Sequence, residues 1–340
     1  MSKIQQKNKE IEQQIREISR NLLKNGEVDV ILGYAKGSVP LATTPIFIKN
    51  EKDVDKLVWN NFCYINLASY LSTPFKNLIN ESNKDIKIGI ISKGCTARAL
   101  IHLSIENQVE LENLKIIGID CNGIINRRKI EKEFYDREIS EVRIKDDTII
   151  IKGKDFEEIL PFDKYLNTLC KKCKVKAPPQ SPELSEIIVG ESQQISTIED
   201  DFEDVIDFES KSPDERWSEI KELLKDCTRC YACREACPLC YCNLCFIDQN
   251  MPSWFDKTYD LSDIIVFHMI RALHLAGRCV ACGACSSVCP MGIDLNLITR
   301  KLEKIVKDRF DFVSGLDPNT IPPMMDFKME DKEEFMLEEN

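Results

Sequence analysis

The sequence is poor in three features that would indicate common functions: positive charge, histidine and long apolar runs. Its net charge is −11 over 340 residues, and it contains only three histidines. A nucleic-acid-binding surface needs a basic footprint, and anionic membranes attract basic segments, so the acidic balance argues against both. No apolar run reaches the length of a membrane span, because the most hydrophobic stretch, 264–276, is interrupted by His268, Arg271 and His274.

The first residues also lack features that would mark an export signal or a phosphate site. The stretch MSKIQQKNKEIEQ is charged and has no apolar segment of the secretory type. No glycine precedes Gly26, and the chain shows neither a phosphate-binding loop nor a Ser-His-Asp arrangement. We therefore expect a cytoplasmic protein that has no nucleophile of its own, and we expect its three histidines, His102, His268 and His274, to be structural.

Cysteine is abundant, with sixteen residues, and half of them fall into a repeated pattern. In a chain without a visible signal segment, this abundance predicts metal binding in a reducing compartment rather than disulfides. Two runs read C-x-x-C-x-x-C-x-x-x-C-P: Cys227, Cys230, Cys233, Cys237 and Pro238, then Cys279, Cys282, Cys285, Cys289 and Pro290. Such spacing is typical of two 4Fe–4S clusters, where three thiolates of each run bind one cluster and the fourth binds the other.

This rule assigns four thiolates to each cluster. Cluster 1 would be held by Cys227, Cys230, Cys233 and Cys289, and cluster 2 by Cys279, Cys282, Cys285 and Cys237. Zinc and disulfides are the alternatives, although zinc sites rarely show this triple spacing. Three more thiols extend the first run: Cys240, Cys242 and Cys245. They are either ligands of a further metal together with Cys63, or packing groups.

The pattern of apolar residues predicts an α/β domain over 1–176. A charged amphipathic helix is expected over 4–23, strands over 28–35, 87–92 and 115–120, a helix over 97–108 and a hairpin over 142–151 turning at Asp146-Asp147. The two later strands are short apolar runs of the buried parallel type. Residues 177–211, with Pro178-Pro179 and many acids, predict a solvated linker.

Residues 212–312 predict an α-helical ferredoxin domain that holds two clusters. Ser212, Pro213 and Glu215 form the signature of a helix start with a capping box. The gap from Cys237 to Cys279 is long enough to contain a helix over 261–275, and another is expected over 294–310. The remaining residues, 313–340, predict a docking or flexible tail.

The same residues resemble a known family, the beta subunits of coenzyme F420-dependent hydrogenases and dehydrogenases, and most of all the formate dehydrogenase beta subunit. The ferredoxin part carries the resemblance through CTRCYACREACPLCYCNLC, HLAGRCVACGACSSVCPMGI and VSGLDPNTIPP. The α/β part carries it through GIISKGCTARAL and IIGIDCNG, followed by a C-x-x-C pair. The resemblance covers most of the chain except the acidic linker.

The resemblance implies a third 4Fe–4S cluster in the α/β domain, together with FAD and a site for the deazaflavin. The cluster positions that match are Cys95, Cys121, Cys170 and Cys173. The residues agree, because Cys95 and Cys121 follow neighbouring strands, where open α/β sheets place ligands. The alternative is that Cys95 and Cys121 are small buried hydrophobes and that the C-x-x-C pair binds zinc.

One departure from the family concerns flavin. The resemblance implies a glycine-containing turn near the first helix, but here that region reads IQQKNKEIEQQI. A charged helix without glycine keeps a ligand away from its backbone. The segment after the C-x-x-C pair, KVKAPPQSPELSEIIVGE, is altered as well. We therefore expect a domain that keeps its cluster and has lost its flavin.

These observations favour an iron–sulfur electron-transfer subunit of an anaerobic oxidoreductase complex. It would relay electrons between a catalytic subunit (a formate dehydrogenase, a hydrogenase or a heterodisulfide-reductase-type flavoprotein) and a redox partner. The alternatives are a flavin-containing subunit that itself oxidises or reduces F420 or NAD(P), and a zinc-stabilised scaffold. Cluster potentials depend on groups around each cluster, so the donor, the acceptor and the direction of electron flow stay open at this point.

Overall fold

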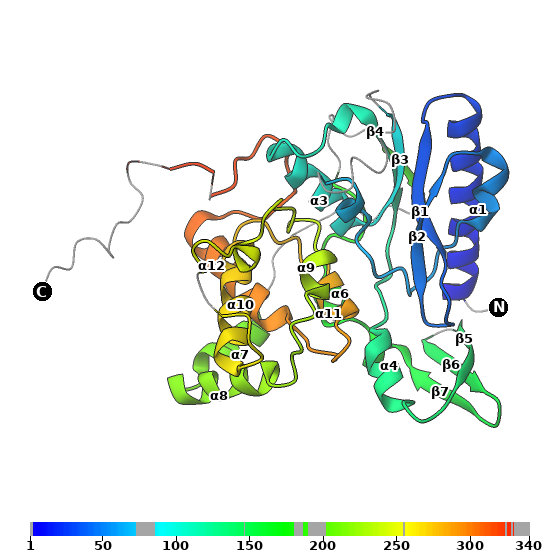
Figure 1. Cartoon of the computed structure of the whole chain (residues 1–340). Coiled ribbons are helices and arrows are strands. Elements are labelled where there is room, and N and C mark those ends of the chain that lie inside the picture. The colour runs from blue at the N-terminus through cyan, green and yellow to red at the C-terminus, as the bar shows by residue number, and fades with distance from the viewer. Residues whose placement is uncertain are drawn as a thin grey trace, which may run out of the picture.

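A computed structural model of the chain describes residues 3–72, 86–145, 147–179, 186–189, 202–253, 256–323, 325–327 and 329. Figure 1 shows a mixed α/β part, built on a sheet by the first half of the chain, beside a helical part built by the second half. The α/β architecture predicted for the first half is confirmed. Among the described residues, no helix combines the length and the apolar character needed to cross a bilayer.

The main sheet has five strands in the order β2-β1-β3-β4-β8. Neighbours run parallel, except that the edge strand β2 is antiparallel to β1. The bounds are β1 Val30–Lys36, β2 Thr43–Ile48, β3 Ile88–Ser92, β4 Leu114–Ile119 and β8 Glu186–Val189. The central strands are largely buried apolar runs, as expected where both faces of a parallel sheet are covered. The three predicted strands are confirmed, with ends shifted by one or two residues.

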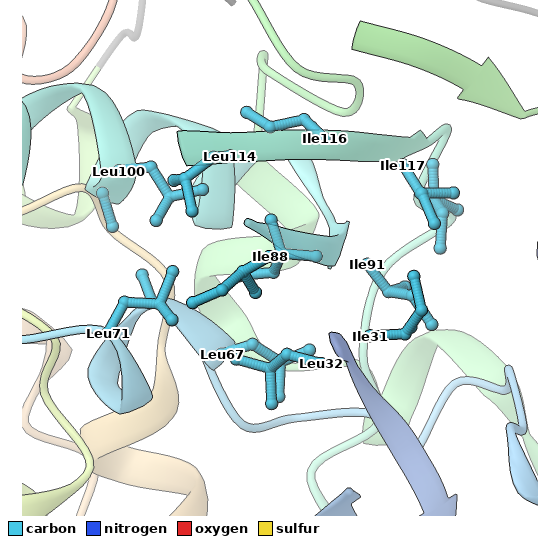
Figure 2. Packing of buried hydrophobic residues seen from close by; sticks show 14 of the residues in the cluster. Ile31, Leu32, Leu67, Leu71, Ile88, Ile91, Leu100, Leu114, Ile116 and Ile117 are labelled. Carbon is cyan, nitrogen blue, oxygen red and sulfur yellow. The ribbon is translucent and has the colours of Figure 1, made fainter. Parts of the chain in front are cut away.

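Helices cover both faces of this sheet (Figure 1). The helix α1 (Lys3–Lys24) lies on one face and buries Ile11, Ile15 and Leu22, the stripe predicted from the sequence. The helix α3 (Gly94–Ile105) lies on the other face and packs on β3, β4 and the 3-10 helix η2 (Leu67–Tyr70). Figure 2 shows this core, in which residues of the strands, α3 and η2 are packed together. The rigid core fixes the carboxyl ends of β3 and β4, where two of the predicted ligands follow.

A smaller three-stranded sheet follows β4. Its order is β5-β6-β7, with β5 Ile139–Lys145, β6 Thr148–Gly153 and β7 Glu157–Pro161, all antiparallel. The predicted hairpin is confirmed, although one of its two turn residues, Asp146, lies outside the described residues. Short helices surround this sheet and the main one: η1 Glu51–Lys56, η3 Leu111–Asn113, α4 Arg127–Glu133, α5 Phe162–Tyr165 and α6 Thr168–Lys172.

The stretch 177–211, predicted to be a solvated linker, supplies two elements to the fold. The strand β8 pairs with β4, and the helix α7 (Glu203–Ser210) packs on α12. Asp204 of α7 accepts hydrogen bonds from Arg300 at 2.6 and 2.8 Å. Acidic side chains of this stretch therefore act partly as partners for basic side chains. Residues 180–185 and 190–201 lie outside the described residues.

The second half of the chain forms helices around the two cysteine runs. Their bounds are α8 Pro213–Leu224, α9 Ala232–Glu235, η4 Phe246–Asp248, α10 Leu261–Leu273, α11 Ala284–Val288 and α12 Asn296–Phe310. Ser212 and Glu215 form the predicted capping box at the start of α8. The helices α8 and α12 both pack on α10, and α9 packs on α11. The start of the predicted tail is packed as well, with Ser314 only 4% exposed.

Candidate metal centres

The first group of thiols comes from both cysteine runs, as predicted. Cys227, Cys230, Cys233 and Cys289 all line one small cavity. Arg229 and Tyr231 adopt left-handed backbone conformations, with φ of 48° and 59°, which bend the loop around the cavity. The backbone N–H of Arg229 donates a hydrogen bond to Cys227 Sγ at 3.4 Å. Burial raises the pKa of Cys233 to about 12, and the nearby Cys227 and Cys289 thiols add to the increase.

The second group repeats this arrangement. Cys237, Cys279, Cys282 and Cys285 line a second small cavity. Ala281 and Gly283 take left-handed conformations here, with φ of 51° and 68°. The backbone N–H of Ala281 donates to Cys279 Sγ at 3.4 Å, matching the bond in the first loop. The repeat in sequence is thus a repeat in structure, with the fourth thiol of each run exchanged between the two groups.

The side chain of Arg271 lies between these two groups. It extends from α10, is 5% exposed, and donates a hydrogen bond of 3.0 Å from Nη2 to the carbonyl oxygen of Cys233. It also lines the cavity of the second group. Burial would lower the pKa of Arg271, but the thiols of Cys240, Cys237, Cys285 and Cys233 raise it well above its usual value. A fixed positive charge therefore lies where both groups would carry negative charge.

The third group collects four thiols from distant parts of the α/β fold. Cys95 lies in the first turn of α3 just after β3, Cys121 follows β4, Cys170 lies in α6 and Cys173 follows α6. Burial raises the pKa of Cys121, and the nearby Cys170 and Cys95 raise it further. Burial also raises the pKa of Cys170 to about 12, with contributions from Cys95 and Cys173. The backbone brings these positions together: Gly94, before Cys95, packs against Val175, two residues after Cys173, and Gly123 contacts both Cys121 and Cys170.

Backbone N–H groups point at two of these sulfurs. Gly123 donates to Cys121 Sγ and Ile124 donates to Cys170 Sγ, both at 3.4 Å. Such bonds stabilise a thiolate and tune the potential of a bound cluster. Gly123 has a φ of +96°, and a Cβ there would lie 2.8 Å from Leu166 and 3.3 Å from Cys170. The loop after β4 therefore fits closely around the third group.

Lys93 is a buried cation beside the third group, and the sequence reasoning missed it. Its side chain is nearly inaccessible, and Nζ donates to the carbonyl oxygens of Cys63 and, at 3.1 Å, of Ile65. Burial alone would lower the pKa of Lys93, but the neighbouring Tyr34, Cys95 and Cys121 raise it. From the sequence, the lysines around the C-x-x-C pair are the candidates for offsetting cluster charge. Lys172 among them forms an ion pair with Asp204, whereas Lys93 is buried beside the thiols.

Histidine and cysteine residues outside the three groups have distinct surroundings. His268 Nε2 lies 3.4 Å from Cys227 Sγ, so this histidine contacts a predicted ligand. Cys63 is buried in the core of the α/β part. Cys240, Cys242 and Cys245 line a cavity of about 290 Å³ in the helical part. Cys63 does not line this cavity, so the structure does not bring together the four thiols considered for a further metal.

A larger cavity of about 340 Å³ lies where the two parts of the molecule meet. It is bounded by Cys173 of the third group and by Val280 and Ala281 of the second. Five basic side chains and two acidic ones line it: Arg98, Lys172, Lys174, Arg300, Lys307, Glu303 and Asp308. Arg98 is 6% exposed, and its Nη2 atom has no hydrogen-bond partner among the described residues.

The region expected to have lost a flavin site is the regular helix α1. Lys7 of this helix forms an ion pair of 3.0 Å with Asp120, the residue before Cys121. The helix therefore contacts the end of β4 through a side chain and offers no close backbone approach there.

Within the described part of the chain, no three His, Cys, Asp or Glu side chains lie close enough to hold a single metal ion.

Comparisons with known proteins confirm the resemblance to formate dehydrogenase beta subunits. No family model matches the chain. The F420-dependent formate dehydrogenase subunit beta of Methanocaldococcus jannaschii is 24% identical, over 90% of this chain and 92% of the relative. The F420-dependent formate dehydrogenase 1 subunit beta of Methanococcus maripaludis is 23% identical, over 89% of this chain and 90% of the relative.

Among solved structures, a chain of the F420-reducing NiFe hydrogenase complex from Methanosarcina barkeri is similar over 50% of this chain and 63% of its own length. The TM-score is 0.37 at 15% sequence identity, a likeness too slight to support an argument.

Proposed function

We propose that this chain is an iron–sulfur electron-transfer subunit of an oxidoreductase complex. It would take single electrons from a catalytic subunit and pass them to a second redox partner, or carry them the other way. Three 4Fe–4S clusters would occupy the three groups of thiols described above. The beta subunits similar to this chain are named as parts of F420-dependent formate dehydrogenases, so a formate dehydrogenase catalytic subunit is the first partner to test.

The observation that supports this function most is the grouping of twelve of the sixteen cysteines into three sets of four. The first two sets each surround their own cavity, and their loops share the same left-handed turns and the same N–H···S bonds. Thiolate is the soft ligand that such clusters use, and four thiolates are the usual number.

The three sets also form a connected series. Arg271 contacts the first and second sets, as described above. Cys173 of the third set lines one cavity together with Val280 and Ala281, which lie between Cys279 and Cys282 of the second set. The second set is therefore the neighbour of both others. A relay would pass from the first set through the second to the third, or in reverse.

The finer division of the chain follows from this proposal. Residues 212–312 would be the α-helical ferredoxin domain for the first two clusters, and residues 1–176 the α/β domain for the third. Residues 177–211 would connect the domains while contributing β8 and α7, and 313–340 would form the C-terminal tail. A reducing compartment such as the cytoplasm would keep the thiols available for iron.

The decisive experiment is an iron and sulfide count on protein purified without oxygen together with its native partners. We expect about twelve irons and an equal amount of sulfide per chain, since each cluster contains about four of each. Zinc in place of iron would contradict the proposal. Co-purification of a formate dehydrogenase catalytic subunit, identified by mass spectrometry, would name the partner, and its absence would direct attention to a hydrogenase or heterodisulfide-reductase-type flavoprotein.

A second candidate function is a flavin-containing subunit that itself oxidises or reduces F420 or NAD(P). The cavity of about 340 Å³ beside Cys173 favours it, because its volume falls in the range of small-molecule sites and its lining carries more basic than acidic side chains. An anionic redox cofactor would find in Arg98 a buried donor atom that has no partner. Flavin released by acid from the same preparation decides between the two. About one flavin per chain supports this second function, and none supports a relay of clusters alone.

A further inference from the structure

The helix α3 connects two of the proposed cluster sites along one of its faces. Cys95, a predicted ligand of the third cluster, lies in its first turn. Arg98, His102 and Glu106 follow at intervals of three or four residues, so they share the face of α3 that Cys95 begins. All three side chains reach residues of the helical part, close to Cys279 and Cys282 of the second set.

Arg98 binds the backbone of the loop that holds the second set. Its Nη1 donates to the carbonyl oxygen of Val280 at 3.3 Å, and its Nε donates to that of Ser314 at 2.9 Å. Val280 lies directly after Cys279, so one end of the contact is the ligand loop itself. The residue after Ser314 also packs closely against α3. A Cβ on Gly315 would lie 2.1 Å from the carbonyl oxygen of Arg98.

His102 and Glu106 hold the residue before Cys279. Glu106 accepts hydrogen bonds from Nε and Nη2 of Arg278 at 2.6 and 2.8 Å, and from the hydroxyl of Tyr241 at 2.7 Å. Ser314 Oγ lies 2.9 Å from His102 Nδ1 and donates to the carbonyl oxygen of Arg278 at 2.8 Å. A bidentate pair between an arginine and a carboxylate fixes geometry as well as charge.

A second segment of the α/β part contacts the same loop, next to a different ligand of the third set. Asn167, three residues before Cys170, is 2% exposed and donates from Nδ2 to Ser287 Oγ at 3.1 Å. Its side chain lies so close to Gly283 that a Cβ there would be 2.8 Å from Oδ1. The loop from 278 to 287 is therefore held next to two different ligands of the third set.

From this arrangement we propose that Arg98 and Glu106 are positioning residues for electron transfer, because they set the separation between the second and third cluster sites. This inference rests on the proposed function. One electron leaves one site, which is oxidised, and enters the other, which is reduced, while no proton or ligand moves. Transfer between such sites falls steeply with distance, so a junction that is locked by buried hydrogen bonds keeps the transfer fast.

The test compares the full chain with Glu106→Gln, Arg98→Lys and the control Glu112→Gln, which removes an exposed carboxylate from the short helix η3. The glutamine side chain in Glu106→Gln would present an amide donor to the guanidinium donors of Arg278. The lysine in Arg98→Lys keeps the charge, but it lacks the planar fork that lets two separate nitrogens of Arg98 reach the two carbonyl oxygens. Cys95→Ala, which would lack the third cluster, identifies the part of the spectrum that depends on it.

The readout is the magnetic interaction between reduced clusters, measured by electron paramagnetic resonance, together with the iron count. We expect Glu106→Gln and Arg98→Lys to keep the wild-type iron content and the interaction between the first two sites, and to lose most of the interaction that Cys95→Ala abolishes. The Glu112→Gln spectrum should equal that of the wild type. Unchanged interaction in both variants overturns the inference, as does iron loss, which would make these residues necessary for cluster retention rather than for spacing.

A failure of the proposed function would be visible without the Arg98 and Glu106 variants. Wild-type protein with fewer than about twelve irons, or with a spectrum that Cys95→Ala does not alter, would show that the third cluster is absent. Wild-type protein with the full iron content and unaffected variants would instead leave the relay in place and remove only the role of Arg98 and Glu106.

Discussion

Arg271 and Cys233 are joined by a hydrogen bond of 3.0 Å, from the guanidinium Nη2 to the backbone carbonyl oxygen. The bond fixes a buried positive charge between the two groups of thiols in the helical part. Reduction adds an electron to a cluster, so a nearby positive charge stabilises the reduced form. We therefore expect Arg271 to raise the reduction potentials of the sites beside it.

Replacing Arg271 with Met should lower the reduction potential of at least one ferredoxin-type site by about 50–150 mV. This range follows from a unit charge at about 6–10 Å in a medium of effective dielectric about 20, with about 59 mV for each tenfold change in a one-electron equilibrium. Redox titration followed by electron paramagnetic resonance measures it. Arg271→Lys, which keeps the charge, is the control and should shift the potential much less. Equal shifts in the two variants would show that the charge is not responsible.

Removing one thiol from the third group should remove one cluster. We expect Cys95→Ala to lose about four of about twelve irons while the other two clusters remain. Cys63→Ala is the matched control, because Cys63 is also a buried thiol near Lys93 but lies outside the three groups. It should keep the full iron content. Iron and sulfide analysis of anaerobically purified variants would contradict the assignment if both variants lost iron equally.

The sequence predicted the first two groups of thiols in full, because their ligands are set by local spacing. Within each run, Cys-x-x-Cys-x-x-Cys places three sulfurs on one loop, and a cysteine a few residues later completes the other group. The third group depends on the topology of the sheet, since Cys95 and Cys121 meet only because β3 and β4 are parallel neighbours. Its assignment from the sequence therefore needed the family resemblance as well.

Four features could not be predicted from local pattern. Arg271 was visible only as an interruption of an apolar helix, and Lys93 only as a charge near Cys95, because burial of a charge is decided by tertiary packing. The strand β8, Glu186–Val189, is too short to identify within an acidic stretch. Only its pairing with β4 in the structure shows that it is a strand. The contacts of α3 with the second cysteine loop join residues more than 170 positions apart.

Replacing Lys93 with Met should weaken the α/β part and shift the third site. The variant leaves the carbonyl oxygen of Cys63 without its buried donor, whereas the carbonyl oxygen of Ile65 still accepts a hydrogen bond of 2.7 Å from the Tyr34 hydroxyl. An unsatisfied acceptor of this kind costs about 1–3 kcal/mol, so we expect the free energy of unfolding to fall by roughly that amount. The loss of a positive charge beside Cys95 and Cys121 should also lower the potential of the third site.

The control for Lys93 is Lys132→Met, which removes an exposed lysine from the last turn of α4. It should change neither the unfolding transition nor the redox titration measurably. Thermal unfolding under anaerobic conditions and potentiometric titration measure the two effects. Equal behaviour of the two variants would show that Lys93 contributes no more than an ordinary surface lysine.

Two glycines allow two effects on stability to be distinguished: the effect of the contact between the two parts of the molecule, and the effect of backbone strain. Gly283 and Gly292 both have a φ of +68°, so alanine at either position costs about 1–2 kcal/mol in backbone strain. A Cβ at Gly292 meets nothing within 4 Å, whereas one at Gly283 would lie 2.8 Å from the side chain of Asn167. Only the substitution at Gly283 pushes the ligand loop away from the α/β part.

Gly283→Ala should therefore lower the melting temperature by several degrees more than Gly292→Ala, at about 2–4 °C for each additional kcal/mol. Hydrogen exchange should increase at the backbone N–H of Asn167, which donates to Ile124 at 2.8 Å beside the third group, only in Gly283→Ala. The physical reason is that Asn167 bonds to Ser287 on one side and precedes Cys170 on the other, so a displaced loop loosens both. If the two variants shift stability and exchange equally, the strain of the left-handed backbone explains the whole effect, and the close fit of Asn167 against Gly283 contributes nothing to the junction.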